Sequence, residues 1–172
     1  MVISVKSLFA RQKSKIYALE IKDEKINEDI ARIIKKLKES VNDVQKAVQN
    51  KNLYAKQEFI QEMQELSKKL LEKSKKVLED VQTIKNIEQK VQEYVEINDS
   101  TFLNNKEEQL KQLNTHIQHF IDLLVSNPSI RTLEEEALET LNQELGELSN
   151  AIQKILDDDQ NLKRIYEKLL EL

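Results

Sequence analysis

The sequence contains no cysteine and no tryptophan, and it has only one glycine and one proline in 172 residues. The absence of cysteine excludes disulfide bonds, thiol catalysis and cysteine-ligated zinc sites, and it favours an intracellular protein. Because glycine and proline mark turns, their scarcity predicts few turns and long uninterrupted elements. A single glycine also excludes the glycine-rich loops that bind nucleotide phosphates.

Long apolar runs and an excess of basic residues are also missing. No window approaches 18 consecutive apolar residues, so we expect no membrane-spanning helix. The net charge is −4, which argues against a general nucleic-acid-binding protein because phosphate binding requires a basic surface. The charge is uneven: residues 1–40 carry a net charge of +4 and residues 100–172 a net charge of −7. This polarity fits docking of the two ends or head-to-tail contact between copies, and it equally fits chance variation on solvated faces.

Apolar residues recur throughout the chain at the seven-residue spacing of packed helices. We therefore predict an all-α fold, an elongated antiparallel helical bundle or coiled coil of about four helices. The chain is expected to form a single domain over residues 1–172, with no separate linker. The predicted helices cover approximately residues 3–49, 53–97, 105–126 and 133–171.

Turn and capping residues determine these predicted boundaries. Pro128 cannot continue a helix and disfavours helix in the preceding residue, so the third helix should end before Asn127. Asn105 is the expected N-cap of that helix, and Thr132 with Glu135 forms an expected capping box for the fourth. Breaks near Asp23 and near Asp159 are the main alternatives to continuous first and fourth helices, and continuity is favoured at both places.

The unequal helix lengths predict an exposed tip on the first hairpin. A third helix of about 22 residues would reverse halfway along a hairpin whose helices are about 45 residues long. Two helices alone cannot cover wide apolar stripes, so this tip should bind a partner or another subunit. The predicted partner-binding residues are Ile33, Ile34, Val41, Val48, Tyr54, Phe59 and Ile60.

These features predict a non-catalytic coiled-coil scaffold, adaptor or structural subunit of a larger protein assembly. Its expected partners are other proteins or further copies of the chain, bound through helical apolar stripes. We expect no enzymatic activity, cofactor, small-molecule substrate or nucleic-acid partner. Serine-hydrolase chemistry, for example, requires sharply turned segments that present a serine beside a histidine and a carboxylate, and long helices lack such turns.

The segment "NTHIQHFIDLL" contains both histidines of the chain, His116 and His119, followed by Asp122. At about 100° per residue, His116 borders the apolar seam of the helix, whereas His119 and Asp122 turn progressively toward solvent. A stable zinc site requires three or four ligands, and no second histidine or cysteine cluster is present to complete one. The prediction is therefore a solvated helix face and no metal site.

The first residues, "MVISVKSLFARQKSKIYAL", include four basic residues and no acidic residue before Glu20. The favoured interpretation is that they form the first turns of a helix packed in the bundle. An amphipathic helix lying on a membrane surface and a mitochondrial transit segment are the alternatives. We accordingly expect a cytoplasmic location, with the mitochondrion left open. The membrane-surface alternative would use Lys6, Phe9, Arg11, Lys13 and Lys15.

A basic first helix and a long second helix are followed by an acidic C-terminal region, and the segment "AVQNKNLYAKQEF" connects the two helices. This organisation is similar to that of ESCRT-III and phage-shock-type membrane-remodelling proteins, and the connecting segment resembles their hairpin tips. The similarity covers residues 1–97 at most. This resemblance implies a peripheral membrane-associated helical hairpin that uses its basic amphipathic N-terminus. It is the alternative to the scaffold function.

Overall fold

The computed structural model describes residues 5–51, 58–92 and 100–171. Within these ranges the chain forms helices and contains no strand, so the all-α prediction is confirmed. No helix in the described ranges has both the length and the apolar character needed to cross a membrane. The helices are α1 (Val5–Gln49), α2 (Phe59–Gln92), α3 (Ser100–Ser126), α4 (Pro128–Arg131), α5 (Glu135–Asp157) and α6 (Asp159–Glu171).

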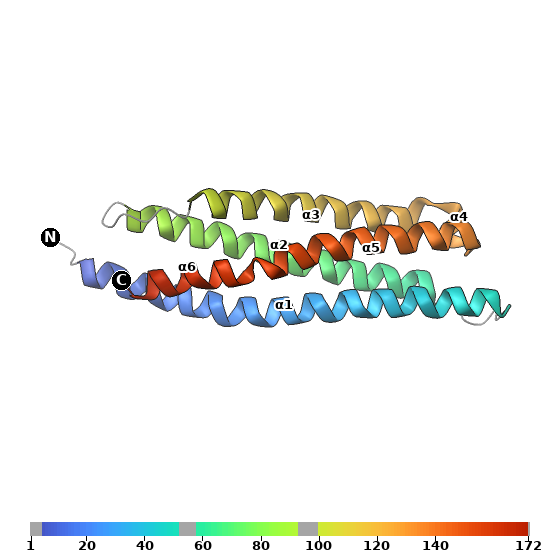
Figure 1. Ribbon diagram of the computed structural model, residues 1–172, viewed down its shortest axis with the longest axis horizontal. Coiled ribbons are helices and arrows are strands. Elements are labelled where there is room, and N and C mark those ends of the chain that lie inside the picture. Colours follow the sequence, from blue (N-terminus) through green and yellow to red (C-terminus); the bar gives the residue numbers. More distant parts are fainter. Residues whose placement is uncertain (1–4, 52–57, 93–99, 172) are drawn as a thin grey trace.

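The long helices form an elongated antiparallel bundle. α2 lies between α1 and α3, while α5 packs against both α1 and α3 and closes the four-helix arrangement. α6 then continues along α1, and Figure 1 shows α5 and α6 following one another end to end, with the start of α1 and the end of α6 at the same end of the bundle. The first helix is continuous over 45 residues, with no break at Asp23.

The start of the third helix differs from the prediction. α3 begins at Ser100, so Asn105 lies inside the helix and is not its N-cap. The additional turn includes Leu103, which is fully buried, and Phe102, which packs against the same apolar cluster. Burial of these side chains therefore outweighs the local capping signal. The predicted second helix also covered residues 53–57 and 93–97, which lie outside the described residues.

The connection from α3 to α5 confirms one predicted boundary and corrects another. α3 ends at Ser126, and the side-chain oxygen of Asn127 accepts hydrogen bonds from the backbone amides of Ser129 and Ile130 at 3.0 and 3.3 Å. Thr132 does not begin a capping box, because its hydroxyl donates to the carbonyl of Pro128 at 3.1 Å and it ends α4. A left-handed residue, Leu133 (φ 57°), then reverses the chain with its side chain buried.

The predicted fourth helix is divided in two. α5 ends at Asp157 and α6 begins at Asp159, so the expectation of one continuous helix over residues 133–171 is wrong. The amide of Asp158 donates to the carbonyl of Lys154 at 3.2 Å, which closes the last turn of α5. The apolar residues keep their spacing across the break, and for this reason the periodicity of the sequence does not reveal it.

The predicted two-helix tip is also corrected, because its apolar stripe is covered. Ile33, Ile34, Val41 and Phe59 are buried, with exposed fractions of 8%, 7%, 0% and 4%. Val48 and Ile60 are half-buried against the same core, and Tyr54 lies outside the described residues.

The cover is supplied by the start of α5, where Leu138 lies beside Val48 at the end of α1. The third helix is longer than predicted, with 27 residues, and α2 begins only at Phe59. The chain consequently reverses at the end of the hairpin rather than halfway along it, and the stripe is interior in the isolated chain.

Candidate functional site

A layer of buried polar residues divides the apolar core into two clusters. Asp23 of α1, Asp80 of α2 and Lys106 of α3 are only 4%, 4% and 2% exposed, and they lie at the level of the break between α5 and α6. We call these three residues the polar layer. The core residues that flank it are Leu19 and Ile26 in α1, Leu103 and Leu110 in α3, and Ile155 and Leu162 in α5 and α6.

Lys106 connects the polar layer to the helix break. Its ammonium group donates a hydrogen bond to the backbone carbonyl of Ile155 at 2.9 Å. Ile155 belongs to the last turn of α5, whose carbonyls have lost their helical donors. A cation is also favoured at a helix C-terminus by the helix dipole. A residue 49 positions away in the sequence therefore stabilises the end of α5.

Charged side chains surround the polar layer nearer the surface. The ammonium group of Lys22 pairs with the carboxylate of Asp80 at 3.6 Å. The carboxylate of Glu107 pairs with the ammonium groups of Lys111 at 3.1 Å and of Lys85 at 3.2 Å. The hydrogen bond from Lys111, together with that from Lys85, holds the pKa of the Glu107 carboxyl below its usual range, although partial burial opposes this effect. These pairs join α1 to α2 and α2 to α3.

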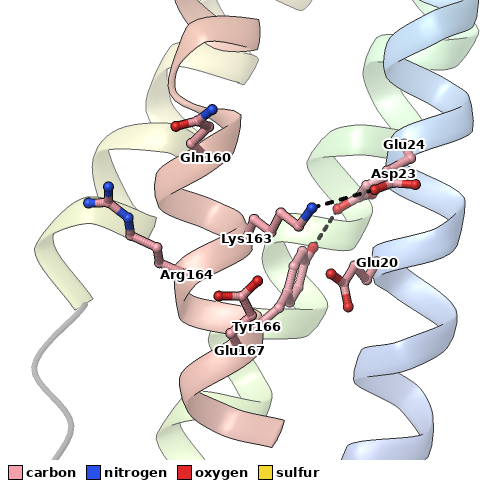
Figure 2. A pocket seen from close by; sticks show the side chains of 8 residues that line it. All are labelled: Glu20, Asp23, Glu24, Gln160, Lys163, Arg164, Tyr166 and Glu167. Carbon is pink, nitrogen blue, oxygen red and sulfur yellow. Dashed lines mark hydrogen bonds and ion pairs between the residues drawn. The ribbon is translucent and has the colours of Figure 1, made fainter.

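A cleft between α1 and α6 opens above Asp23, as Figure 2 shows. At its floor the hydroxyl of Tyr166 donates a hydrogen bond to the Asp23 carboxylate. At its rim Lys163 pairs with Glu24 at 3.8 Å. The cleft has a volume of about 410 Å³ and carries charged groups of both signs on its walls. Its lining residues are Glu20, Asp23, Glu24, Gln160, Lys163, Arg164, Tyr166 and Glu167.

Two large apolar side chains lie exposed beside this cleft. Tyr17 is 57% exposed and Ile21 is 71% exposed, and they stand one turn apart on α1. At 100° per residue, they lie about 60° and 100° around the helix from Glu20, with Glu24 between Glu20 and Tyr17. The exposed pair therefore borders the acidic wall of the cleft, and we call Tyr17 and Ile21 the exposed pair.

The sequence did not single out the exposed pair, because Tyr17 and Ile21 lie off the seven-residue apolar spacing of this segment. Ile16 and Leu19 are buried against α6 and the neighbouring helices, as the packed interpretation predicts. Among the residues assigned to the membrane-surface alternative, Arg11 and Lys15 are exposed and Lys13 is half-buried. The side chains of Lys6 and Phe9 lie outside the described residues.

The histidine segment has the orientation that the sequence predicts. His116 is half-buried at the edge of the core, whereas His119 and Asp122 are exposed. The structure adds neighbours from another helix: His116 faces α5, with its Nε2 atom 3.8 Å from a carboxylate oxygen of Glu144. Glu147 lies on the same side of α5. In the sequence, Glu144 and Glu147 are distinguished only by their three-residue spacing, and such a spacing is common in a chain with 31 acidic residues.

Comparison with known protein families, with curated proteins and with solved structures finds no match to this chain.

Proposed function

We propose that this protein is a non-catalytic helical scaffold, adaptor or structural subunit that binds a partner protein on the α1–α6 face. The observation that supports this proposal is the exposed pair: Tyr17 and Ile21 adjoin a cleft with charged walls. Apolar anchors within a charged rim are the usual composition of a protein–protein interface. Buried aromatic and aliphatic anchors also carry most of the binding energy at such interfaces.

A helical segment is the partner that this face would suit. α1 and α6 run side by side, so the shallow groove between them follows the helix axes. A partner helix laid in that groove would contact Tyr17 and Ile21 with residues one turn apart. Its charged flanks would meet the acids Glu20 and Glu24 on the α1 wall. On the α6 wall they would meet charges of both signs, from Lys163, Arg164 and Glu167.

Site-specific photocrosslinking tests the proposal. A benzophenone amino acid is placed at Tyr17 and, as a matched control, at Asn42, which is exposed on the distal half of the same helix. We expect a discrete crosslinked protein from position 17 in cells of the source organism and none from position 42. Ile21→Glu, added to the position-17 protein, should remove that product because it places a charge in the apolar contact.

The same products from both positions, or a product that survives Ile21→Glu, would contradict binding at this face. Circular dichroism of each variant provides the folding control. Ile21 is 71% exposed, so its replacement should leave the stability of the bundle within about 0.5 kcal/mol of the original.

A membrane-surface function is the second candidate, and one observation favours it. Arg11, Lys15 and Lys22 are exposed on the side of the exposed pair that faces away from the cleft. Basic residues beside exposed apolar side chains are typical of helices that lie on anionic lipid. Cosedimentation with phosphatidylserine vesicles tests this function. Reversal of Arg11, Lys13 and Lys15 to glutamate should abolish sedimentation, and a protein that stays in the supernatant before reversal would exclude it.

A further inference from the structure

His116, Glu144 and Glu147 converge at the surface between α3 and α5. His116 and Glu144 are each about one-third exposed, and their side chains approach to 3.8 Å across the two helices. Glu147 stands one turn after Glu144 on α5. One ligand atom from each of the three residues lies within 4.8 Å of the other two. Two helices thus bring three metal-ligating groups to one point.

These distances are close to those that a metal ion requires. Zinc binds imidazole nitrogen and carboxylate oxygen at about 2.0–2.2 Å, so ligand atoms around one ion stand about 3.3–3.6 Å apart in a tetrahedron. Rotamer changes that move the glutamate carboxylates by roughly 1 Å would close the group around an ion. The three ligands come from helices, and helices hold ligands in place more firmly than loops do.

The packing beneath the group supports such a site. Leu113 and Ile117 flank His116 in α3 and are buried, as are Leu145 and Leu148 beside the two glutamates. The backbone under each ligand is therefore held by the core. The group lies at the edge of an open cleft of about 500 Å³, which leaves room for a water molecule as a fourth ligand.

The charges and donor types indicate which cation would bind. Two carboxylates and a neutral imidazole supply a charge of −2, which matches a divalent ion. The imidazole nitrogen favours zinc and its transition-metal neighbours over magnesium or calcium, which prefer oxygen ligands. Lys154 also lines the cleft, and its positive charge opposes cation binding. The amides of Gln109, Gln112 and Asn150 line the same cleft and are neutral.

We propose that His116, Glu144 and Glu147 form a surface site for a divalent transition-metal ion, with zinc as the preferred ion, and that the ion links α3 to α5. His116 comes from α3 and both glutamates come from α5, so the ion would crosslink helices that the chain connects only through α4. This proposal is independent of the partner-binding function and uses none of the same residues.

Isothermal titration calorimetry of chelator-treated protein with zinc chloride tests the site. We expect one zinc ion per chain, and at least a roughly tenfold loss of affinity in each of His116→Ala, Glu144→Gln and Glu147→Gln. The chain offers two matched controls. His119→Ala removes the only other histidine, and Glu139→Gln removes an exposed carboxylate of α5 outside the group. Both controls should bind zinc as the unaltered protein does.

Three results would overturn the proposal. The first is an unaltered protein that binds no zinc. The second is a loss in His119→Ala equal to that in His116→Ala, since it would place the ion on the histidine pair of α3 alone. The third is unchanged affinity in both glutamate variants, since the ion would then be held by a single histidine. All substituted positions are at least partly exposed, and the helical circular dichroism signal of each variant is the folding control.

Discussion

The hydroxyl of Tyr166 in α6 donates a hydrogen bond to the buried carboxylate of Asp23 in α1, across 143 positions of sequence. Tyr166 and Asp23 are 2% and 4% exposed, so the bond is shielded from water. It attaches the last helix to the first below the cleft where the partner is proposed to bind. The loss of a donor to a buried oxygen costs more than the loss of an exposed hydrogen bond, because water cannot replace the missing donor.

We predict that Tyr166→Phe destabilises the protein by about 1–3 kcal/mol, because a buried carboxylate loses a hydrogen-bond donor. Urea denaturation measures the change. Tyr17→Phe is the matched control, since it removes the same hydroxyl from a side chain that is 57% exposed, and it should shift stability by less than about 0.5 kcal/mol. Equal effects of the two substitutions would show that the hydroxyl of Tyr166 contributes nothing beyond its solvation.

Lys106→Met is predicted to destabilise the junction of α5 and α6. The substitution preserves the aliphatic stem but removes the ammonium group that caps the Ile155 carbonyl, at a cost of about 1–3 kcal/mol. Hydrogen exchange should also accelerate at the amides of residues 156–162. Lys69→Met, on the exposed side of α2, is the control. Unchanged exchange at the junction would contradict a capping role for Lys106.

The features that could be predicted from the sequence are those that depend on the local spacing of apolar residues. The seam residues Leu141, Leu145 and Leu148 are fully buried, as their alternating four- and three-residue spacing indicates. The stop at Asn127 is also local, because Pro128 imposes it. Both features depend only on residues within a few turns of one another, and for this reason the all-α fold and the course of the first helix could be predicted.

Features that depend on contacts between distant residues could not be predicted in this way. The break at Asp158 is invisible in the seam, and the residue that stabilises it, Lys106, lies in another helix. The approach of His116 to Glu144 depends on the register of α3 against α5. The register of α3 and α5 against the first two helices also determines whether the end of the hairpin is covered. An error of a few residues in a predicted helix length is enough to make a covered hairpin end look exposed.

Gly146 offers a substitution that should stabilise the protein. It lies inside α5, and a methyl group added there would meet no atom within 4 Å apart from its neighbours in the same helix. Alanine has a higher helix propensity than glycine by about 1 kcal/mol, so Gly146→Ala should raise the melting temperature by about 2–4 °C. Differential scanning calorimetry measures the shift. A lower melting temperature would indicate a close approach to another chain at this position, which a methyl group would obstruct.

Glu107 provides a prediction about pH. Lys111 and Lys85 lower the pKa of its carboxyl in the folded protein, so its ionised form is preferentially stabilised by folding. The resulting stability is fully present above the pKa of an unfolded glutamate, about 4.3, and is lost as the pH falls through the lower folded value. Glu107→Gln removes this contribution, so the variant should be less stable than the original protein at pH 7.

The difference in unfolding free energy between Glu107→Gln and the original protein should narrow as the pH is lowered from 5 toward 3. The reason is that the Glu107 carboxyl of the original protein becomes protonated and no longer pairs with the two lysines. Urea denaturation across this range measures the difference at each pH. Glu108→Gln is the matched control, since Glu108 is the adjacent acid and is exposed. Its difference from the original protein should stay small and nearly constant. A Glu107→Gln difference that is independent of pH would mean that Lys85 and Lys111 do not stabilise the ionised carboxylate in the fold.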